Sequence, residues 1–229
     1  MITQKLSGYT NAFTSFDYTG YLFDIPVVNW DKVLPVFADC MKNCTFEEEH
    51  MNSEVKAVIQ ELKMYRDDYT WSLADGLITT IFESHPYHYP IIGYKQDLWS
   101  LKRETLVNFY QKHYVPQNAT LVLVGDLDPD QALQQVQASF GAIPRGDDIK
   151  NPEFYINDEV QSKTVTLYRA VEQSTCMLAF TVPGAKARND FVYDVIGYVL
   201  ANGKGSRLHK LLVDDTQLAV SIHAMSYDL

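Results

Sequence analysis

Two glutamates seven residues apart are the residues of this sequence best placed to do chemistry. Glu54 and Glu61 lie in the stretch from Thr45 to about Tyr65, whose apolar residues recur with a helical period. At 100° per residue, the two side chains lie about 20° apart around the helix. They flank the apolar stripe, so a carboxylate here can lie at the edge of a core and face a site. The same spacing is common on the solvated flank of a helix, and the pattern alone favours that simpler interpretation.

Two other groups of residues have the types, but not the spacing, of a functional site. His85 and His88 form the only close histidine pair, but Pro86 between them opposes a rigid helical metal site, and a surface loop is favoured. The run Gly203–Ser206 lacks the full G-x-x-x-x-G-K-[ST] spacing of a phosphate loop, which favours a turn at the start of a helix. The three cysteines are too few and too scattered for a disulfide framework or a cysteine-built zinc site.

The composition bounds the possible partners. The chain has 229 residues, 46% of them hydrophobic, which is typical of a globular protein. Its 29 acidic and 19 basic residues give a net charge of −10, which disfavours binding to nucleic acid or to an anionic membrane surface. No window approaches 18 uninterrupted apolar residues, so we expect no membrane span. The first ten residues show no targeting signal, and the compartment stays open between cytoplasm and periplasm.

The elements that must position the glutamates follow from local patterns. Aromatic and β-branched residues predict a hairpin of strands 9–14 and 19–26. Thr45 and Glu48 have the spacing of a capping box at the start of the glutamate helix. Further helices are predicted at 31–44, 71–82, 103–114, 128–140, 190–200 and 206–213. Further strands are predicted at 120–124, where the apolar run indicates a strand buried on both faces, and at 164–169, 175–182 and 218–225.

Six blocks of residues share the motifs of a known family, in the family's order. They are N-A-x-T at 11–14, E-x-x-x-x-x-x-E at 54–61, H-P-Y with P-I-x-G at 85–93, F-Y with Y-x-P-x-N-A at 109–119, F-G with I-P at 140–144, and S-R-L at 206–208. Together they resemble the insulinase, pitrilysin and mitochondrial processing peptidase family of zinc metallopeptidases. The family's H-x-x-E-H motif lies before the hairpin, whereas all six histidines here follow it. We therefore expect an internal fragment or a shortened relative.

The resemblance implies a fold and a domain order. We expect an α+β fold, a two-layer α/β sandwich of the metallohydrolase type, with helices packed on one face of a mostly antiparallel sheet. Residues 1–145 would form the N-terminal peptidase-like domain without its first elements. Residues 146–162, which include Gly146, Pro152 and five acidic residues, would be a linker, and 163–229 would begin a second, similar, non-catalytic domain.

The resemblance also implies roles for particular residues. Glu61 matches the family's third zinc ligand, and Glu54 matches a second glutamate that supports the site. The strand 9–14 matches the sheet edge to which an extended peptide substrate adds, so Asn11, Ala12 and Phe13 are the expected substrate-binding residues. Alternatively, Asn11 only fixes the hairpin turn. Since a catalytic zinc needs three protein ligands, we expect Zn²⁺ in the complete protein but no tight binding by this chain.

Three functional hypotheses follow. The first is a zinc-dependent metalloendopeptidase that cleaves peptides or unfolded polypeptides, present as an incomplete chain that is inactive alone. The second is a non-catalytic relative that binds peptides or acts as a scaffold beside an active subunit. The third is an unrelated α/β binding domain. Missing elements would expose strand edges and apolar surface, so the expected partners are a peptide substrate and either the remaining peptidase domains or a homo- or hetero-oligomeric partner.

Overall fold

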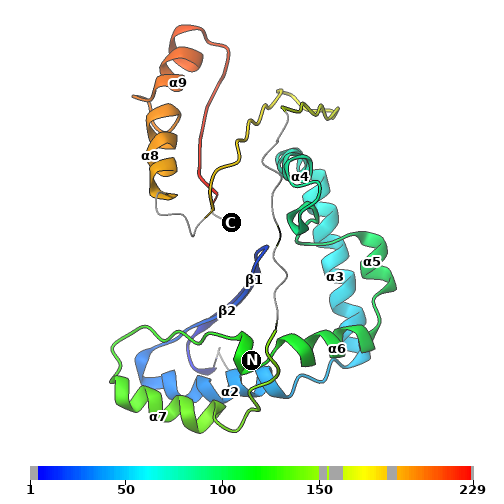
Figure 1. Cartoon of the computed structure of the whole chain (residues 1–229), viewed down its shortest axis with the longest axis vertical. Coiled ribbons are helices and arrows are strands. Elements are labelled where there is room, and N and C mark those ends of the chain that lie inside the picture. Colours follow the sequence, from blue (N-terminus) through cyan, green and yellow to red (C-terminus); the bar gives the residue numbers. More distant parts are fainter. Residues whose placement is uncertain (1–4, 150–153, 155–161, 185–189, 228–229) are drawn as a thin grey trace. The chain divides into compact units, whose positions relative to one another are not determined.

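The computed structural model of the chain describes residues 5–149, 154, 162–184 and 190–227 (Figure 1). These residues belong to two compact units, Met1–Met177 and Leu178–Leu229. The predicted linker at 146–162 lies largely outside the described residues. Its bounds, and those of the two domains on either side, therefore stay predictions.

The first unit is built mainly from helices, with one hairpin. Its elements in chain order are β1 (Tyr9–Thr14), β2 (Thr19–Asp24), α2 (Trp30–Lys42), α3 (Glu48–Asp67), α4 (Tyr69–Ile81), α5 (Lys95–Ser100), α6 (Arg103–His113) and α7 (Pro129–Phe140). Short 3₁₀ turns at Val27–Asn29, Pro86–His88 and Pro116–Asn118 join some of them. The predicted helices of this unit are thus confirmed to within a few residues. No helix in the described part of the chain is both long and apolar enough to cross a bilayer.

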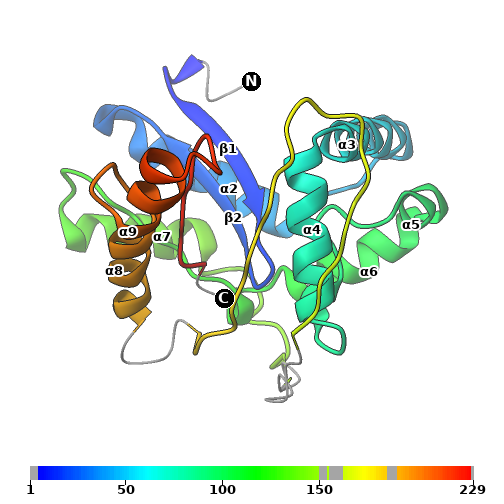
Figure 2. The same cartoon turned by 90° about the horizontal axis from the view of Figure 1, so that it is seen from above.

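The predicted hairpin is confirmed. Strands β1 and β2 pair antiparallel, with Asn11 opposite Leu22 and Ala12 opposite Tyr21. The Ser15 N–H donates to the Tyr18 carbonyl at 2.8 Å and closes the turn. The hairpin lies against α2 (Figure 2). The ring centroids of Phe23 and Phe37 lie 4.3 Å apart.

The buried hydrophobic residues of this unit lie on α2, α3 and α6, and α3 packs against α4 and α5. These buried residues are Val33, Leu34, Ala38, Ile59, Leu62 and Tyr110. Helix α7 lies beside α2, and its start is set by Asp128, whose carboxylate accepts a hydrogen bond from the Gln131 N–H at 2.9 Å. Asp128 as cap, followed by Pro129 in the first turn, is a common start of a helix.

The predicted capping box at Thr45 is wrong, because the backbone before α3 is held from elsewhere. Phe46 has a left-handed backbone, with φ of +49°, and the helix begins only at Glu48. The Arg103 guanidinium of α6 donates to the Thr45 carbonyl at 2.7 Å and to the Phe46 carbonyl at 2.8 Å. These two bonds fix the bend from which α3 starts, and the Thr45 side chain caps nothing.

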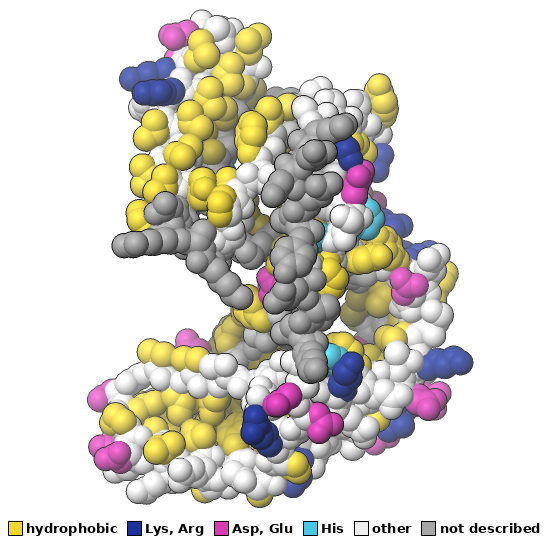
Figure 3. Space-filling view, viewed as in Figure 1, with side chains coloured by type: hydrophobic (Ala, Val, Ile, Leu, Met, Phe, Trp, Pro, Cys, Tyr) yellow, Lys and Arg dark blue, Asp and Glu magenta, His cyan; other side chains and the backbone are white. Residues whose placement is uncertain are grey.

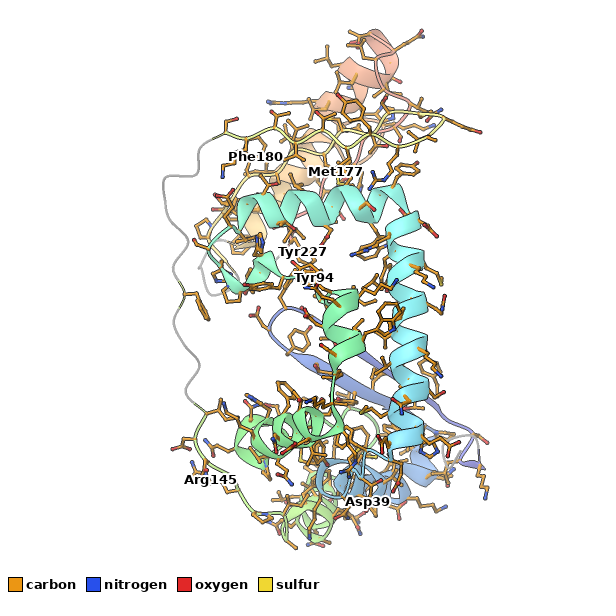
Figure 4. The ribbon with its side chains drawn as sticks, turned by 90° about the vertical axis from the view of Figure 1, so that its right-hand side faces the viewer. Asp39, Tyr94, Arg145, Met177, Phe180 and Tyr227 are labelled. Atoms are coloured by element: carbon orange, nitrogen blue, oxygen red, sulfur yellow. The ribbon has the colours of Figure 1, made fainter. Side chains whose placement is uncertain are left out.

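Helix α3 ends at a sharp corner with α4 (Figure 4). Asp68 stands between the two helices. Its carboxylate accepts hydrogen bonds from the N–H groups of Thr70 at 2.8 Å and Trp71 at 3.2 Å. The cap therefore sets both where α4 starts and where Trp71 lies.

The expectation of a mostly antiparallel sheet is not supported. The described residues form a single two-stranded sheet, β1 with β2. The segments 120–124, 164–169, 175–182 and 218–225 have no strand partner among the described residues. The strand predicted as buried is instead exposed, with Val124 91% accessible. A strand exists only through hydrogen bonds with neighbouring strands, so an apolar run without such neighbours forms no ladder.

The second unit contains α8 (Asp190–Leu200), α9 (Arg207–His209) and a π-helical turn, Lys210–Asp215. The predicted helix at 190–200 is confirmed. Asn202, just after it, holds the backbone of Ala224 by two hydrogen bonds, one to its carbonyl at 2.6 Å and one from its N–H at 3.0 Å. At Gly203–Ser206 the serine hydroxyl and N–H both donate to the Gly203 carbonyl, so this run is the turn before α9.

Candidate functional site

Glu54 and Glu61 share one exposed face of α3, called here the glutamate face. On it, the Glu61 carboxylate is held by a hydrogen bond. The Tyr65 hydroxyl donates a hydrogen bond to Glu61 Oε1 at 3.0 Å. Four residues apart, the two side chains lie about 40° apart around the helix and meet one turn along its surface. Glu61 is exposed and makes no ion pair with a cation of the described residues. Its second oxygen is therefore free to bind a group from outside the described chain.

Tyr65 is held in turn by Trp71. The two rings lie 5.1 Å apart, and the tryptophan is positioned by the Asp68 cap at the start of α4. The hydrogen bond to Glu61, with a smaller effect of burial, raises the pKa of Tyr65, so its hydroxyl stays protonated and donates. The sequence reasoning missed this contact, although a tyrosine four residues after a glutamate on one helix is a signal for it.

Glu54 lies two turns before Glu61 on the same exposed face. Its carboxylate makes no hydrogen bond or ion pair with the residues that the structure describes. The spacing predicted for the pair is thus present on one helix. The predicted support of the site by Glu54 stays a prediction, since no contact here links it to Glu61.

The three expected substrate-binding residues lie inside β1, away from the turn. Asn11 precedes the turn by four residues, which contradicts the alternative that it fixes the turn. Its Oδ1 accepts a hydrogen bond from the Ala12 N–H at 2.9 Å, so that N–H is engaged locally. The Phe13 ring packs edge-on against Tyr18, 5.7 Å away, and lies over Gly20, where a Cβ would approach it to 2.5 Å. Substrate binding by these residues stays a prediction.

The H-P-Y loop joins the tip of the hairpin. The Tyr87 hydroxyl donates to both carboxylate oxygens of Asp17, at 2.9 and 2.8 Å, and its ring packs against Phe16. Both histidines are used locally: His85 Nδ1 accepts from the Tyr87 N–H, and His88 Nδ1 lies 3.1 Å from the Thr79 carbonyl. The sequence gives no sign of the Tyr87–Asp17 pair, because 70 residues separate its members.

The Tyr87–Asp17 contact predicts a late tyrosine titration. Burial, with the hydrogen bond to Asp17, raises the pKa of Tyr87 from 10.0 to about 12. Because the folded pKa is the higher one, the contact stabilises the fold fully below pH 10 and is lost as the pH rises toward 12. We expect Tyr87→Phe to remove one late step from an ultraviolet titration of tyrosinate.

The matched control for that titration is Tyr69→Phe. Tyr69 is exposed, and its hydroxyl has no hydrogen bond to a described residue. This variant should keep the late step. Equal curves for the two variants would contradict the contact.

Comparison with known proteins identifies the family of this chain. A family model described as "Insulinase (Peptidase family M16)" matches residues 2–95, and one described as "Peptidase M16 inactive domain" matches residues 100–228. The chain belongs to peptidase family M16. This confirms the resemblance to the insulinase family, and with it the assignment of the chain to a family of metalloproteases.

Individual members of M16 agree with this membership. The M16 chain is 29% identical to "Zinc protease PqqE" of Helicobacter pylori over 95% of its own length and 50% of that protein. It matches the crystal structure of a protease from H. pylori with a TM-score of 0.81 at 24% identity, covering all of this chain and 56% of the other. It matches a peptidase M16 inactive domain from Pseudomonas fluorescens with a TM-score of 0.77 at 15% identity, covering 99% and 55%.

Two facts follow for the M16 chain. It has the fold of M16 peptidases, and it spans about half the length of the curated relatives it matches. Those relatives are named zinc proteases, which makes zinc the metal of the family. A catalytic zinc takes three protein ligands, and the described residues contain no group of three His, Cys, Asp or Glu placed to hold a metal. The residues that the structure describes therefore do not by themselves form a site for a zinc ion.

Proposed function

We propose that this chain supplies the glutamate ligand of a zinc-dependent metalloendopeptidase that cleaves peptides or unfolded polypeptides. The carrying observation is the Glu61 carboxylate, which is exposed on α3, held through one oxygen by Tyr65 and paired with no described cation. Family membership supports reading that free oxygen as a metal ligand. In this proposal the two histidine ligands come from an H-x-x-E-H segment, which the sequence of this chain does not contain.

The proposal assigns the remaining residues as follows. Glu54 adds negative charge beside the metal, two turns before Glu61. An extended substrate pairs with the free edge of β1 at Asn11 and Ala12, where the Ala12 N–H must first leave the Asn11 side chain. Phe13, 48% exposed beside Tyr18, offers an apolar contact to a substrate side chain.

Metal binding with and without the missing motif tests the proposal. The chain alone should retain no stoichiometric zinc after dialysis and should show no chelator-sensitive cleavage of an unfolded polypeptide. The same chain extended before residue 1 by a family segment that carries H-x-x-E-H should retain one zinc and cleave the polypeptide. Tight binding of one zinc by the unextended chain, or none by a folded extended chain, would contradict the proposal.

A non-catalytic role is the second candidate. It is favoured by the description "inactive domain" for the model that matches residues 100–228, and by the absence of a three-residue metal group in the described part. In that case the chain binds peptides along β1 beside an active subunit. Peptide binding that persists in the extended chain without zinc and without cleavage would select this function.

A further inference from the structure

A small hollow lies between the end of α3 and the start of α5. It has a volume of about 380 Å³ and is lined by Arg66, Tyr94, Lys95, Gln96 and Trp99. Arg66 lies in the last turn of α3, and the other four residues lie in α5 or directly before it. Helix α5 packs against α3, and Figure 4 shows Tyr94 at the start of α5. The lining thus combines two cations, two aromatic rings and one amide, with no carboxylate.

Neither cation of the hollow forms an ion pair with a described residue. Asp75 of α4 acts on Arg66 only from beyond ion-pair distance: burial raises the pKa of Asp75, and the Arg66 charge opposes that shift. Figure 3 shows basic side chains dispersed over the surface, with acidic ones among them. In a chain with a net charge of −10, two cations that line one hollow without an acidic partner attract an anion to it.

Trp99 gives the hollow an exposed aromatic wall. It is 68% exposed, which is unusual for so large a ring. The Lys95 ammonium lies 4.3 Å from the centroid of this ring, and this cation–π contact holds the charge beside the hollow. The indole N–H of Trp99 donates to no described residue, so it is available to a ligand. Tryptophan and arginine are among the residues that contribute most to binding when a ligand covers them.

The chemistry of the lining selects the class of ligand. A guanidinium presents a planar fork that matches a carboxylate, and a neighbouring ammonium adds a second positive charge. The rings of Tyr94 and Trp99 suit an aromatic group next to that carboxylate. At about 30 Å³ per water-sized group, a volume of about 380 Å³ holds roughly a dozen such groups. This is room for about two amino-acid side chains.

We propose that this hollow binds a carboxylate of a polypeptide, with the two cations contacting the carboxylate and the two rings contacting an aromatic side chain next to it. The choice of a polypeptide rests on the proposed function, in which the chain acts on peptides. The hollow itself is separate from Glu61, because Arg66 lies five residues later and about 140° further around the helix. A polypeptide bound here would be selected for an acidic residue or a chain terminus, and not for a basic residue.

Binding of short peptides to the full chain, without zinc, tests the proposal. The probes are acetyl-Phe-Glu-amide, acetyl-Phe-Gln-amide and acetyl-Gly-Phe with a free terminal carboxylate. The readout is the indole N–H signals of the three tryptophans in ¹H–¹⁵N NMR spectra, among which Trp99→Phe identifies the Trp99 signal. The two peptides with a carboxylate should move this signal, and less so as salt is added, while the other two indole signals stay in place. The glutamine peptide should have no effect.

The peptides also identify the source of the carboxylate. Tighter binding of the glutamate peptide assigns the hollow to an acidic side chain, and tighter binding of the free-terminus peptide assigns it to the end of a chain. Equal binding of the glutamate and glutamine peptides, or no movement of the Trp99 signal, would overturn the proposal. A signal that moves with inorganic phosphate but with no peptide would also overturn it. None of these outcomes depends on zinc or on cleavage, so they leave the test of the proposed function separate.

Substitutions that remove one charge test the contact with the carboxylate. Arg66→Gln and Lys95→Gln should each weaken binding of the tighter peptide about two- to fivefold, the effect of one exposed ion pair. Lys56→Gln is the matched control, because Lys56 is exposed on α3 but does not line the hollow. It should leave the affinity unchanged, and circular dichroism checks that all three variants are folded. Equal affinities of the three variants would show that the two cations do not contact the ligand and would overturn the proposal.

Discussion

Replacing Glu61 by glutamine should abolish zinc retention in the chain extended by an H-x-x-E-H segment. The amide keeps the size of the side chain and can still accept the Tyr65 hydrogen bond, but it removes the negative charge that a zinc ligand supplies. Loss of a partner that only supports a ligand typically lowers metal affinity about 10- to 100-fold, and loss of the ligand itself should exceed that. The measurement is the zinc content per folded chain after dialysis against a graded series of chelator concentrations.

Two glutamates on the same helix provide the controls. Glu54→Gln should weaken zinc retention by about 10-fold or more, as expected of a supporting carboxylate. Glu48→Gln, at the exposed start of α3, should leave it unchanged. If Glu61→Gln retains zinc as well as Glu48→Gln does, then Glu61 is not a ligand, and the non-catalytic function becomes the better explanation of this chain.

Leu62→Ala should destabilise the first unit more than other substitutions on α3. Leu62 is 2% exposed and is the largest fully buried side chain among the described residues. Truncation of a buried leucine costs about 2–5 kcal/mol, through lost burial and the cavity left behind. Since the core of this unit is small, that is a large part of its free energy of unfolding. Leu62 also adjoins Glu61, so the same change should disorder the glutamate face.

The matched control for this prediction lies on the same helix. Met64 is 71% exposed, and Met64→Ala should change the free energy of unfolding by less than about 0.5 kcal/mol. Urea unfolding followed by far-ultraviolet circular dichroism compares the two variants. Equal midpoints would show that α3 is not anchored through Leu62.

The helices could be predicted because their determinants are local. Asp128 caps α7 at its own first turn, and Asp68 caps α4 directly after α3. The capping box at Thr45 had the right spacing and was wrong. Its failure comes from Arg103, whose guanidinium holds the preceding carbonyls from another helix, a contact that spacing along one helix cannot reveal.

The strands could be predicted only in the hairpin, where the partner lies a few residues away. The run Thr120–Val124 has the composition of a buried strand, but its partner is not among the described residues. In the candidate site, too, contacts within one helix could be predicted and contacts between distant segments could not. The place of Glu61 on α3 followed from the helical period, and its bond to Tyr65 lay within one turn. The pairing of Tyr87 with Asp17 joins residues 70 positions apart and left no signal in the sequence.

Because of the bend before α3, the direction of this helix depends on Arg103, which is far in the sequence from Glu54 and Glu61. Arg103 reaches two successive carbonyls with donors held at a fixed spacing by one planar group. A lysine would bring the same charge but a single rotatable ammonium on a flexible stem, so the angle at which α3 departs would become a range. If the metal ligands come from separate segments, a variable direction of α3 would move the Glu61 carboxylate away from the position of the metal.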